Sequence, residues 1–288
     1  MGHSLRPLLH GALDELRSGA LEIHPSVLIG CLGLALAYGW AVGPMARRLG
    51  WTEVRAERWR AASWYGALVP VFAALDGPLH ELSDEYLFSA HMGQHMLLMM
   101  IVPPLLILGL PPTLIRRCLR SAPVLGAARL LTHPAVAFVA YNLVFLGWHF
   151  PGAYNAALVN HDLHIVQHLM FISTAVMMWW PVVAPVAELE RIPDGPVLMM
   201  YVFAFGIPTT ILSAFITMSE SVFYPFYAAA PRISTLSPLQ DQRLGGLLMW
   251  IPGMLIFWVA ITAVWFRWTR EEYAEWRQEA RQAAASGI

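Results

Sequence analysis

The 288-residue sequence is short of charge, since aspartate, glutamate, lysine and arginine make up only 13% of it. Soluble domains carry roughly 25% of these residues. Lysine is absent altogether, so all eighteen basic residues are arginine. Because the shortage extends along the whole chain, it argues against a soluble domain with one membrane anchor. It predicts instead a multi-pass membrane protein embedded in the lipid bilayer. No basic patch is present, so we expect no nucleic-acid partner.

Cysteine is also scarce. Cys31 falls in the first apolar run and Cys118 in an arginine-rich loop, at depths too different for a disulfide, and neither belongs to a CxxC pair. The chain also lacks a phosphate-binding loop and the GxSxG, HExxH and CxxCH motifs. The predicted inner loops are too short for a catalytic domain, so we expect a protein that is not an enzyme.

Long apolar runs dominate the chain instead. A helix needs about 20 apolar residues to cross a bilayer, and seven segments approach that length: 26–46, 60–75, 86–110, 133–150, 162–184, 197–218 and 243–267. The second and fourth are short or interrupted by polar residues. We predict an all-α bundle of about seven transmembrane helices, forming one membrane domain at 26–268. An amphipathic lead-in at 1–25 precedes it, and a tail at 269–288 follows.

The arginines predict the orientation of this bundle. Short cytoplasmic loops of membrane proteins carry an excess of basic residues. The loops after the first and third spans and the C-terminal tail are arginine-rich, whereas the loops after the second and fourth spans contain no basic residue. The N-terminus and the 1–25 lead-in are therefore predicted to lie outside, with the 269–288 tail in the cytoplasm.

On this topology, five histidines approach the outer face. His91 and His95 lie in the first turns of the third span, His164 and His168 in those of the fifth, and His149 at the end of the fourth. Histidines spaced i, i+4 share one side of a helix, a known metal-binding spacing. One such residue is more simply explained by a hydrogen bond to a neighbouring helix. Two pairs and a fifth histidine at one depth favour a functional metal site, because ionisable residues inside a membrane are unfavourable.

Other side chains lie close to these histidines in the helical pattern. Gln94 shares the stripe of the first pair, and His161 falls in the arc of the second. Met92 and Met96 lie at similar depth and offer thioether sulfurs suited to Cu(I). Most methionines in so apolar a chain fill the core or face lipid, so these two, like His161, are the weaker candidate ligands.

Three stretches carry a family resemblance. They are LFSAHMGQHMLLMMIVPPLLILGLPP at 87–112, WHFPGAYNAAL at 148–158 leading into HIVQHLMFISTAVMMWWPV at 164–182, and SPLQDQRLGGLLMWIPG at 237–253. In this order and spacing they resemble the CtaG family of bacterial cytochrome c oxidase assembly factors, over residues 80–267. The resemblance implies a multi-pass protein of the bacterial inner membrane that helps to mature a copper-containing oxidase. The same module also occurs fused to CopD-like copper domains.

The resemblance also assigns residues. The family's motif positions correspond here to His91, Gln94, His95, Trp148, His149, His164, His168, Asp241, Gln242 and Gly246. Asp241 and Gln242 are expected to cap the site and to fix an imidazole tautomer, as groups behind metal ligands commonly do, with Gln94 and Trp148 in support. Gln167 departs from the family, in which many members carry an acidic residue, so no proton-relay role is carried over to it.

The expected function is oxidase assembly with copper bound or relayed at the outer face. The ligands would be His91, His95, His164, His168 and His149, and the partner an oxidase subunit or another copper chaperone. A haem-binding electron carrier with axial histidines and a metal-free assembly scaffold remain alternatives. A proton or ion transporter is least favoured, because 97–110 and 170–178, in the inner halves of spans three and five, are nearly bare of polar residues.

Overall fold

The computed structural model describes residues 25–183, 185–189 and 192–286, without the side chains of 283–286. Every regular element in these ranges is a helix, and no strand occurs among them, which confirms the predicted all-α class. The predicted lead-in at 1–25 lies outside the described residues except for Pro25.

The first half of the described chain forms the helices of the first three predicted spans and the short elements between them. These are α2 (Pro25–Trp40), the π-helical turn η1 (Ala41–Met45), α3 (Ala46–Arg48), α4 (Arg58–Leu75), α5 (Pro78–Glu81), η2 (Leu82–Tyr86), α6 (Phe88–Met96), η3 (Leu97–Ile101) and α7 (Val102–Gly109). The wide turn η3 immediately precedes Pro103 and Pro104, which cannot donate to the helical ladder.

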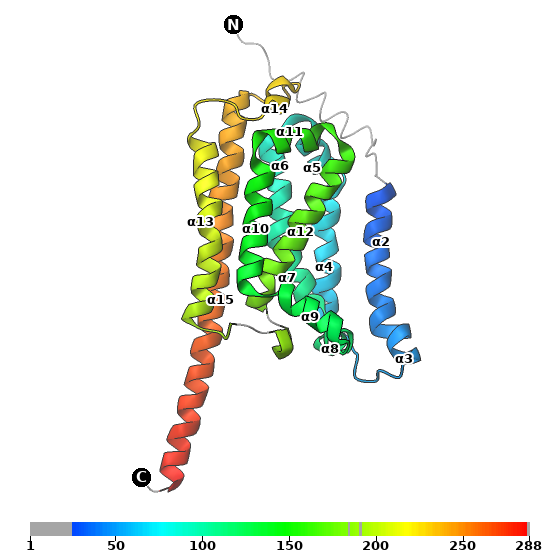
Figure 1. The fold of residues 1–288 in the computed structure, drawn as a ribbon, viewed down its shortest axis with the longest axis vertical. Coiled ribbons are helices and arrows are strands. Elements are labelled where there is room, and N and C mark those ends of the chain that lie inside the picture. The colour runs from blue at the N-terminus through cyan, green and yellow to red at the C-terminus, as the bar shows by residue number, and fades with distance from the viewer. Residues whose placement is uncertain (1–24, 184, 190–191, 287–288) are drawn as a thin grey trace.

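The second half forms the rest of the bundle. Its elements are α8 (Pro112–Cys118), α9 (Ala122–Leu131), α10 (Pro134–His149), α11 (Pro151–Val159), α12 (His161–Val183), the 3-10 turn η4 (Ala187–Leu189), α13 (Pro196–Met218), α14 (Pro225–Ala229) and α15 (Pro238–Ser286). Proline begins most of these helices. The first residue of a helix has no intrahelical acceptor for its N–H, so proline, which lacks that N–H, loses no hydrogen bond there. Helix α15 runs on through the predicted tail and projects beyond the bundle (Figure 1).

Five helices in the described part of the chain are long and apolar enough to cross a membrane: 25–48, 88–109, 161–183, 196–218 and 238–282. The pair α9 and α10, bent by 61°, would make a sixth. Helix α4 has 18 residues but carries Arg58 and Arg60 in its first turn. It is not among the apolar five, so the predicted seventh span is not confirmed.

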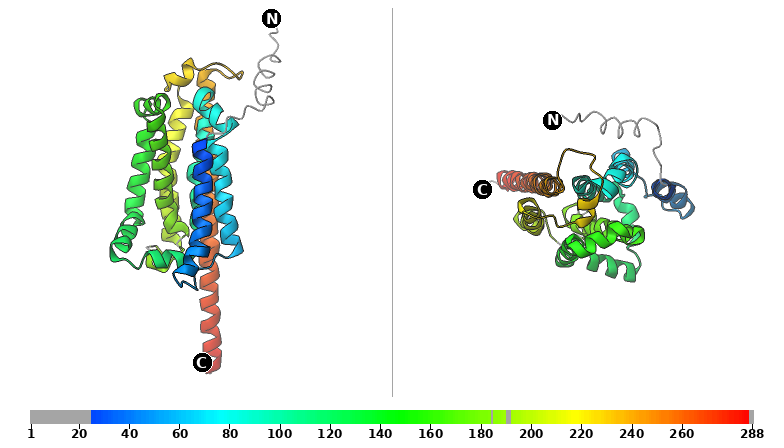
Figure 2. Two further views of the ribbon diagram at one scale, coloured as in Figure 1. Left: turned by 90° about the vertical axis from the view of Figure 1, so that its right-hand side faces the viewer. Right: turned by 90° about the horizontal axis from the view of Figure 1, so that it is seen from above.

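The helices pack side by side around a core rich in aromatic and methionine side chains. Helix α13 packs along α15, α15 along α6, α10 along α12 and α4 along α7, as the two views of Figure 2 also show. Helix α2 stands at the edge of the bundle and buries only Tyr38. Because α6 and α12 both lie inside the bundle, the sides of these helices that carry the histidines face protein.

The two ends of the bundle differ in composition. The basic last turns of α3, α8 and α9 lie at the end from which α15 projects, whereas α5, α11 and α14 lie at the opposite end (Figure 1). This separation agrees with the alternation of arginines along the sequence. Which membrane face each end meets stays a prediction.

Candidate metal centre

Three helices bring the predicted histidines together. Helix α6 contributes His91 and His95, α12 contributes His164 and His168, and α10 ends at His149. Their exposed fractions range from 0% for His91 to 7% for His168. Ring centroids are 4.3 Å apart within each pair, 5.3 Å between His91 and His164, and 5.3 Å between His95 and His168. The two pairs therefore face each other across α6 and α12.

Two groups of side chains in this cluster have the geometry of a metal site. One nitrogen each from His91, His95 and His168 lie within 4.8 Å of one another. A second group, also within 4.8 Å, combines Asp84, His91 and His164. The ring of His149 is 6.3 Å from that of His95 and borders the first group. His91 thus belongs to both groups.

Asp84 was not predicted as a ligand. It lies in η2, just before α6, and its carboxylate accepts a hydrogen bond from Nδ1 of His164 at 3.3 Å. Burial works to raise the pKa of Asp84, but the hydrogen bond from His164 and the imidazoles of His91 and His80 hold that pKa well below its usual range. The residue therefore supplies a negative charge beside the cluster. The sequence signal was its i, i+4 spacing from His80, with which it pairs at 3.6 Å.

Tyr227 fixes the tautomer of His91. Its hydroxyl donates to the carbonyl of Ser83 at 2.6 Å, and the same oxygen lies 2.8 Å from Nδ1 of His91. A phenol has one hydrogen to donate, so Nδ1 of His91 must donate to it. The lone pair of His91 is then on Nε2, which lies 2.8 Å from Nε2 of His95. No sequence pattern pointed to Tyr227, which is 136 residues from His91.

The remaining imidazoles have nitrogens that the protein leaves without partners. Nδ1 of His149 donates to the carbonyl of Phe145 at 2.6 Å. Among the described residues, nothing bonds to the buried Nε2 atoms of His149, His164 and His168 or to Nδ1 of His95. Buried polar atoms are rarely left in this condition. A bound metal ion would satisfy them, so the donor set fits a metal.

The hydrogen bonds that Asp241 and Gln242 make with the described residues go to groups other than imidazoles. The carboxylate of Asp241, at the start of α15, accepts hydrogen bonds from the backbone N–H groups of Phe88 and Ser89 at 2.8 and 3.2 Å and from the Ser89 hydroxyl at 2.5 Å. Gln242 bonds to backbone atoms of Phe223 and Ser221. The role expected for them, fixing an imidazole tautomer, is instead filled by Tyr227, Asp84 and the Phe145 carbonyl. Asp241 positions the helix that carries His91.

The supporting predictions have mixed outcomes. The Gln94 amide is buried and donates to the Ala74 carbonyl at 2.7 Å, with His80 at 3.3 Å, so it ties α6 to α4 and α5. Trp148 is half-buried against the aromatic core. His161 is exposed at the start of α12 and belongs to neither group of possible ligands in the described part of the chain.

The two methionines that were the weaker candidate ligands pack elsewhere. Met92 lies against Gly245, and Met96 lies against Gly253, both on α15. The Met96 sulfur is 3.9 Å from the position of a Cβ on Gly253. Both methionines serve the packing of α6 against α15.

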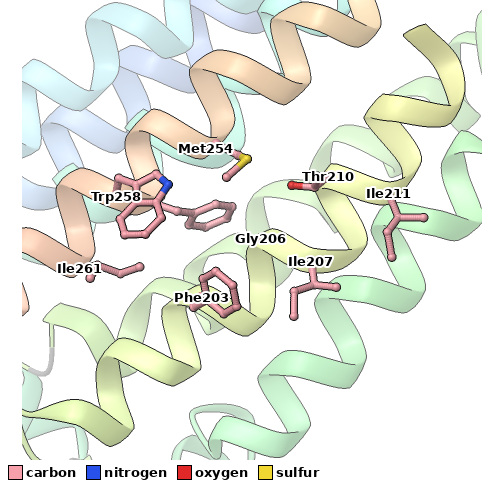
Figure 3. A pocket seen from close by; sticks show the side chains of 9 residues that line it. Phe203, Gly206, Ile207, Thr210, Ile211, Met254, Trp258 and Ile261 are labelled. Carbon is pink, nitrogen blue, oxygen red and sulfur yellow. The ribbon is translucent and has the colours of Figure 1, made fainter. Parts of the chain in front are cut away.

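A separate apolar groove lies between α13 and α15 (Figure 3). Phe203, Ile207, Trp258 and Ile261 line it, with Thr210 as its one hydroxyl. None of its lining residues is titratable, so it is unrelated to the histidine cluster.

Comparison with known proteins finds relatives in mycobacteria. The chain is 28% identical to an uncharacterized protein of Mycobacterium bovis, with 89% of this chain and 40% of the relative covered. A Mycobacterium tuberculosis relative matches to the same extent, and one of Mycobacterium leprae is 25% identical, with 89% and 41% covered. The chain thus spans about two fifths of the length of these relatives. No solved structure shows significant similarity to it.

A family match covers most of the chain, including every residue of the histidine cluster. Residues 36–271 match the cytochrome c oxidase caa3 assembly factor family, Caa3_CtaG, to which this chain belongs.

Proposed function

We propose that this protein binds copper in the histidine cluster and passes it on during the maturation of cytochrome c oxidase. The observation that carries the proposal is the buried group of His91, His95 and His168, whose nitrogens lie within 4.8 Å of one another. The unpartnered nitrogens around that group support it, because they leave the cluster incomplete without a bound cation.

The geometry needs only a small adjustment to hold an ion. Metal–nitrogen bonds of about 2.0 Å place neighbouring ligand nitrogens roughly 3.3–3.5 Å apart. The Nε2 atoms of His91 and His95 are 2.8 Å apart and share one proton. For an ion to bind both atoms, the two rings would separate by about half an ångström, as bonds of that length require, and the proton would move to Nδ1 of His95. His149 is near enough to His95 to serve as a further ligand.

Copper is favoured by the family together with the ligand type. Imidazole suits copper, zinc, iron and nickel, so the cluster alone does not select among them. Membership of an oxidase assembly family favours copper, because the resemblance implies the maturation of a copper-containing oxidase. Copper would be cargo, received from a chaperone or delivered to an oxidase subunit, and the protein itself would catalyse no reaction.

The proposal is tested by the copper content of detergent-purified protein. Wild type loaded with Cu(I) and passed through a desalting column is expected to retain about one equivalent, the number that the overlapping groups can hold. A variant with alanine at His91, His95, His164 and His168 is expected to retain none. His161→Ala is the matched control, because it removes an exposed histidine from the same helix and should leave copper binding unchanged.

Three outcomes would overturn the proposal. Retention of zinc in preference to copper would reassign the metal. Copper-free protein with normal thermal unfolding after loading would favour the metal-free scaffold. A Soret band would favour haem, which the geometry supports less well because a porphyrin would have to separate α6 from α12, whose imidazoles now pack against each other.

A further inference from the structure

His91 is shared by two ligand groups that lie at different depths. The outer group adds Asp84 and His164, and the inner group adds His95 and His168. His95 follows His91 by four residues, as His168 follows His164. Four residues advance a helix by about 6 Å, so the inner group lies roughly one helical turn further into the bundle. The side chain of Asp84 is 23% exposed, whereas the histidines of both groups are buried, His164 at 6% and His168 at 7%.

The chemistry of one imidazole makes the two groups alternatives. A neutral imidazole carries its proton on one nitrogen and a free lone pair on the other. His91 can therefore bind an ion in one group at a time. Its hydrogen bond to Tyr227 keeps the proton on Nδ1 and so presents the lone pair toward His95.

The two positions differ in charge. The outer position contains the carboxylate of Asp84, the most exposed side chain of the two groups, and a negative charge at the exposed end of a buried site attracts a cation. The inner position is built from imidazoles alone, with His149 beside it. Nitrogen donors without a carboxylate suit a softer ion better than a mixed oxygen and nitrogen set does.

We propose that the cluster holds one copper ion in two alternating positions, captured by Asp84, His91 and His164 and then held deeper by His91, His95 and His168. The shared ligand His91 stays bound while Asp84 and His164 are exchanged for His95 and His168. No electron is transferred in this exchange. This inference rests on the proposed function and adds a direction to it, from the exposed end of the cluster inward.

The test separates capture from retention. Purified protein is loaded with Cu(I) under anaerobic conditions, and three quantities are measured: the stoichiometry, the affinity by competition with a chromophoric Cu(I) chelator, and the loading rate by stopped-flow. X-ray absorption reports the ligands. Wild type should bind one equivalent with nitrogen ligands only.

Variants of the two positions should then behave differently. Asp84→Asn should still bind one equivalent with unchanged ligands but load at least tenfold more slowly, and His164→Gln should do the same. His168→Ala should load at the wild-type rate, bind at least tenfold more weakly, and show an oxygen ligand. Glu85→Gln is the matched control, since this exposed carboxylate adjoins Asp84 and should change neither quantity.

Several results would overturn the inference. Two equivalents in wild type would mean two separate sites. An unchanged loading rate in Asp84→Asn, or equal effects of Asp84→Asn and His168→Ala on rate and affinity, would mean one static site. Each of these results leaves copper binding itself intact. Wild-type protein that binds no copper would instead refute the proposed function, so the two failures are distinguishable.

Discussion

At the residue scale, the cluster depends on groups that hold each imidazole in one orientation. Tyr227 comes from the short helix α14 and reaches His91 on α6, while the Phe145 carbonyl holds His149 and the Asp84 carboxylate holds His164. Such groups behind a metal ligand select which nitrogen faces the ion. Each removes the freedom of one ring to flip, and so prepares the lone pairs before an ion is bound.

The role of Tyr227 gives a prediction. Tyr227→Phe keeps the ring but removes the oxygen that accepts from Nδ1 of His91, so copper affinity should fall about 10- to 100-fold, as for other groups behind metal ligands. Chelator competition measures this. Tyr201→Phe is the control, because the hydroxyl of this half-buried tyrosine donates to the Met178 carbonyl at 3.1 Å, outside the cluster. Equal affinities in both variants would show that Tyr227 does not orient His91.

At the element scale, the start of α6 is capped by a side chain from another helix. Residue Leu87, which precedes the first turn, has no polar side chain, and the N–H groups of Phe88 and Ser89 bond instead to Asp241 on α15. Asp241 has an exposed fraction of 0%. A carboxylate at a helix N-terminus also interacts favourably with the helix dipole. The cap therefore joins α15 to the helix that carries His91 and His95.

Loss of this cap should destabilise the protein. Asp241→Ala leaves two buried N–H groups and a hydroxyl unpaired, and the free energy of unfolding should fall by about 1–3 kcal/mol. The free energy of unfolding of Asp241→Asn should fall less, because the amide oxygen can still accept a hydrogen bond from one donor. Thermal unfolding in detergent checks the order of the three proteins. Asp162→Asn serves as control, since Asp162 is an exposed acid in the first turn of α12.

Two glycines of helix α15 differ in how closely a neighbouring helix approaches them. A Cβ at Gly246 would lie 2.4 Å from the Thr217 hydroxyl and 2.9 Å from the Thr217 backbone nitrogen. A Cβ at Gly253 would meet nothing nearer than 3.6 Å, the terminal carbon of Met96. The resemblance singled out Gly246 as a motif position, and the contact between α13 and α15 explains why glycine fits there.

The two glycines form a matched pair for mutation. Gly246→Ala should lower the free energy of unfolding by about 1–3 kcal/mol, because backbone atoms of α13 must move to admit the methyl group. Gly253→Ala should change stability little, since it fills ordinary space and favours the helix. Detergent unfolding curves compare them. Equal stability in the two variants would contradict the close packing of α13 on α15.

At the scale of the whole molecule, the arginine-bearing turns and the histidine cluster lie at opposite ends of the bundle. Basic segments stay in the cytoplasm. A reporter enzyme that works only in the cytoplasm should therefore be active when fused after Arg270, and one that works only outside the membrane should be inactive. A cysteine introduced at His161, at the cluster end, should be labelled by an impermeant thiol reagent applied to intact spheroplasts. Labelling only after the membrane is broken would invert the orientation, and with it the side from which copper arrives.

The sequence by itself determined the all-α class of the molecule and picked out the five histidines that the bundle brings together. Apolar runs, prolines at helix starts and the i, i+4 pairs at 91/95 and 164/168 are local properties that a helix of 3.6 residues per turn converts directly into structure. The helix boundaries accordingly lie close to those predicted, except that α15 (Pro238–Ser286) continues well past 267, where its span was predicted to end. Whether α4 spans the membrane could not be decided from the sequence. Arg58 and Arg60 lower its apolar character, while its packing against α7 places it in the bundle.

Only the tertiary structure decided how distant residues meet. Asp84 joined the cluster, Tyr227 took the tautomer-fixing role expected of Asp241, and Met92 and Met96 turned toward α15. These outcomes depend on the rotation of each helix about its axis and on the loops that carry Asp84 and Tyr227. Both are set by the packing of the whole bundle, which no local sequence pattern encodes.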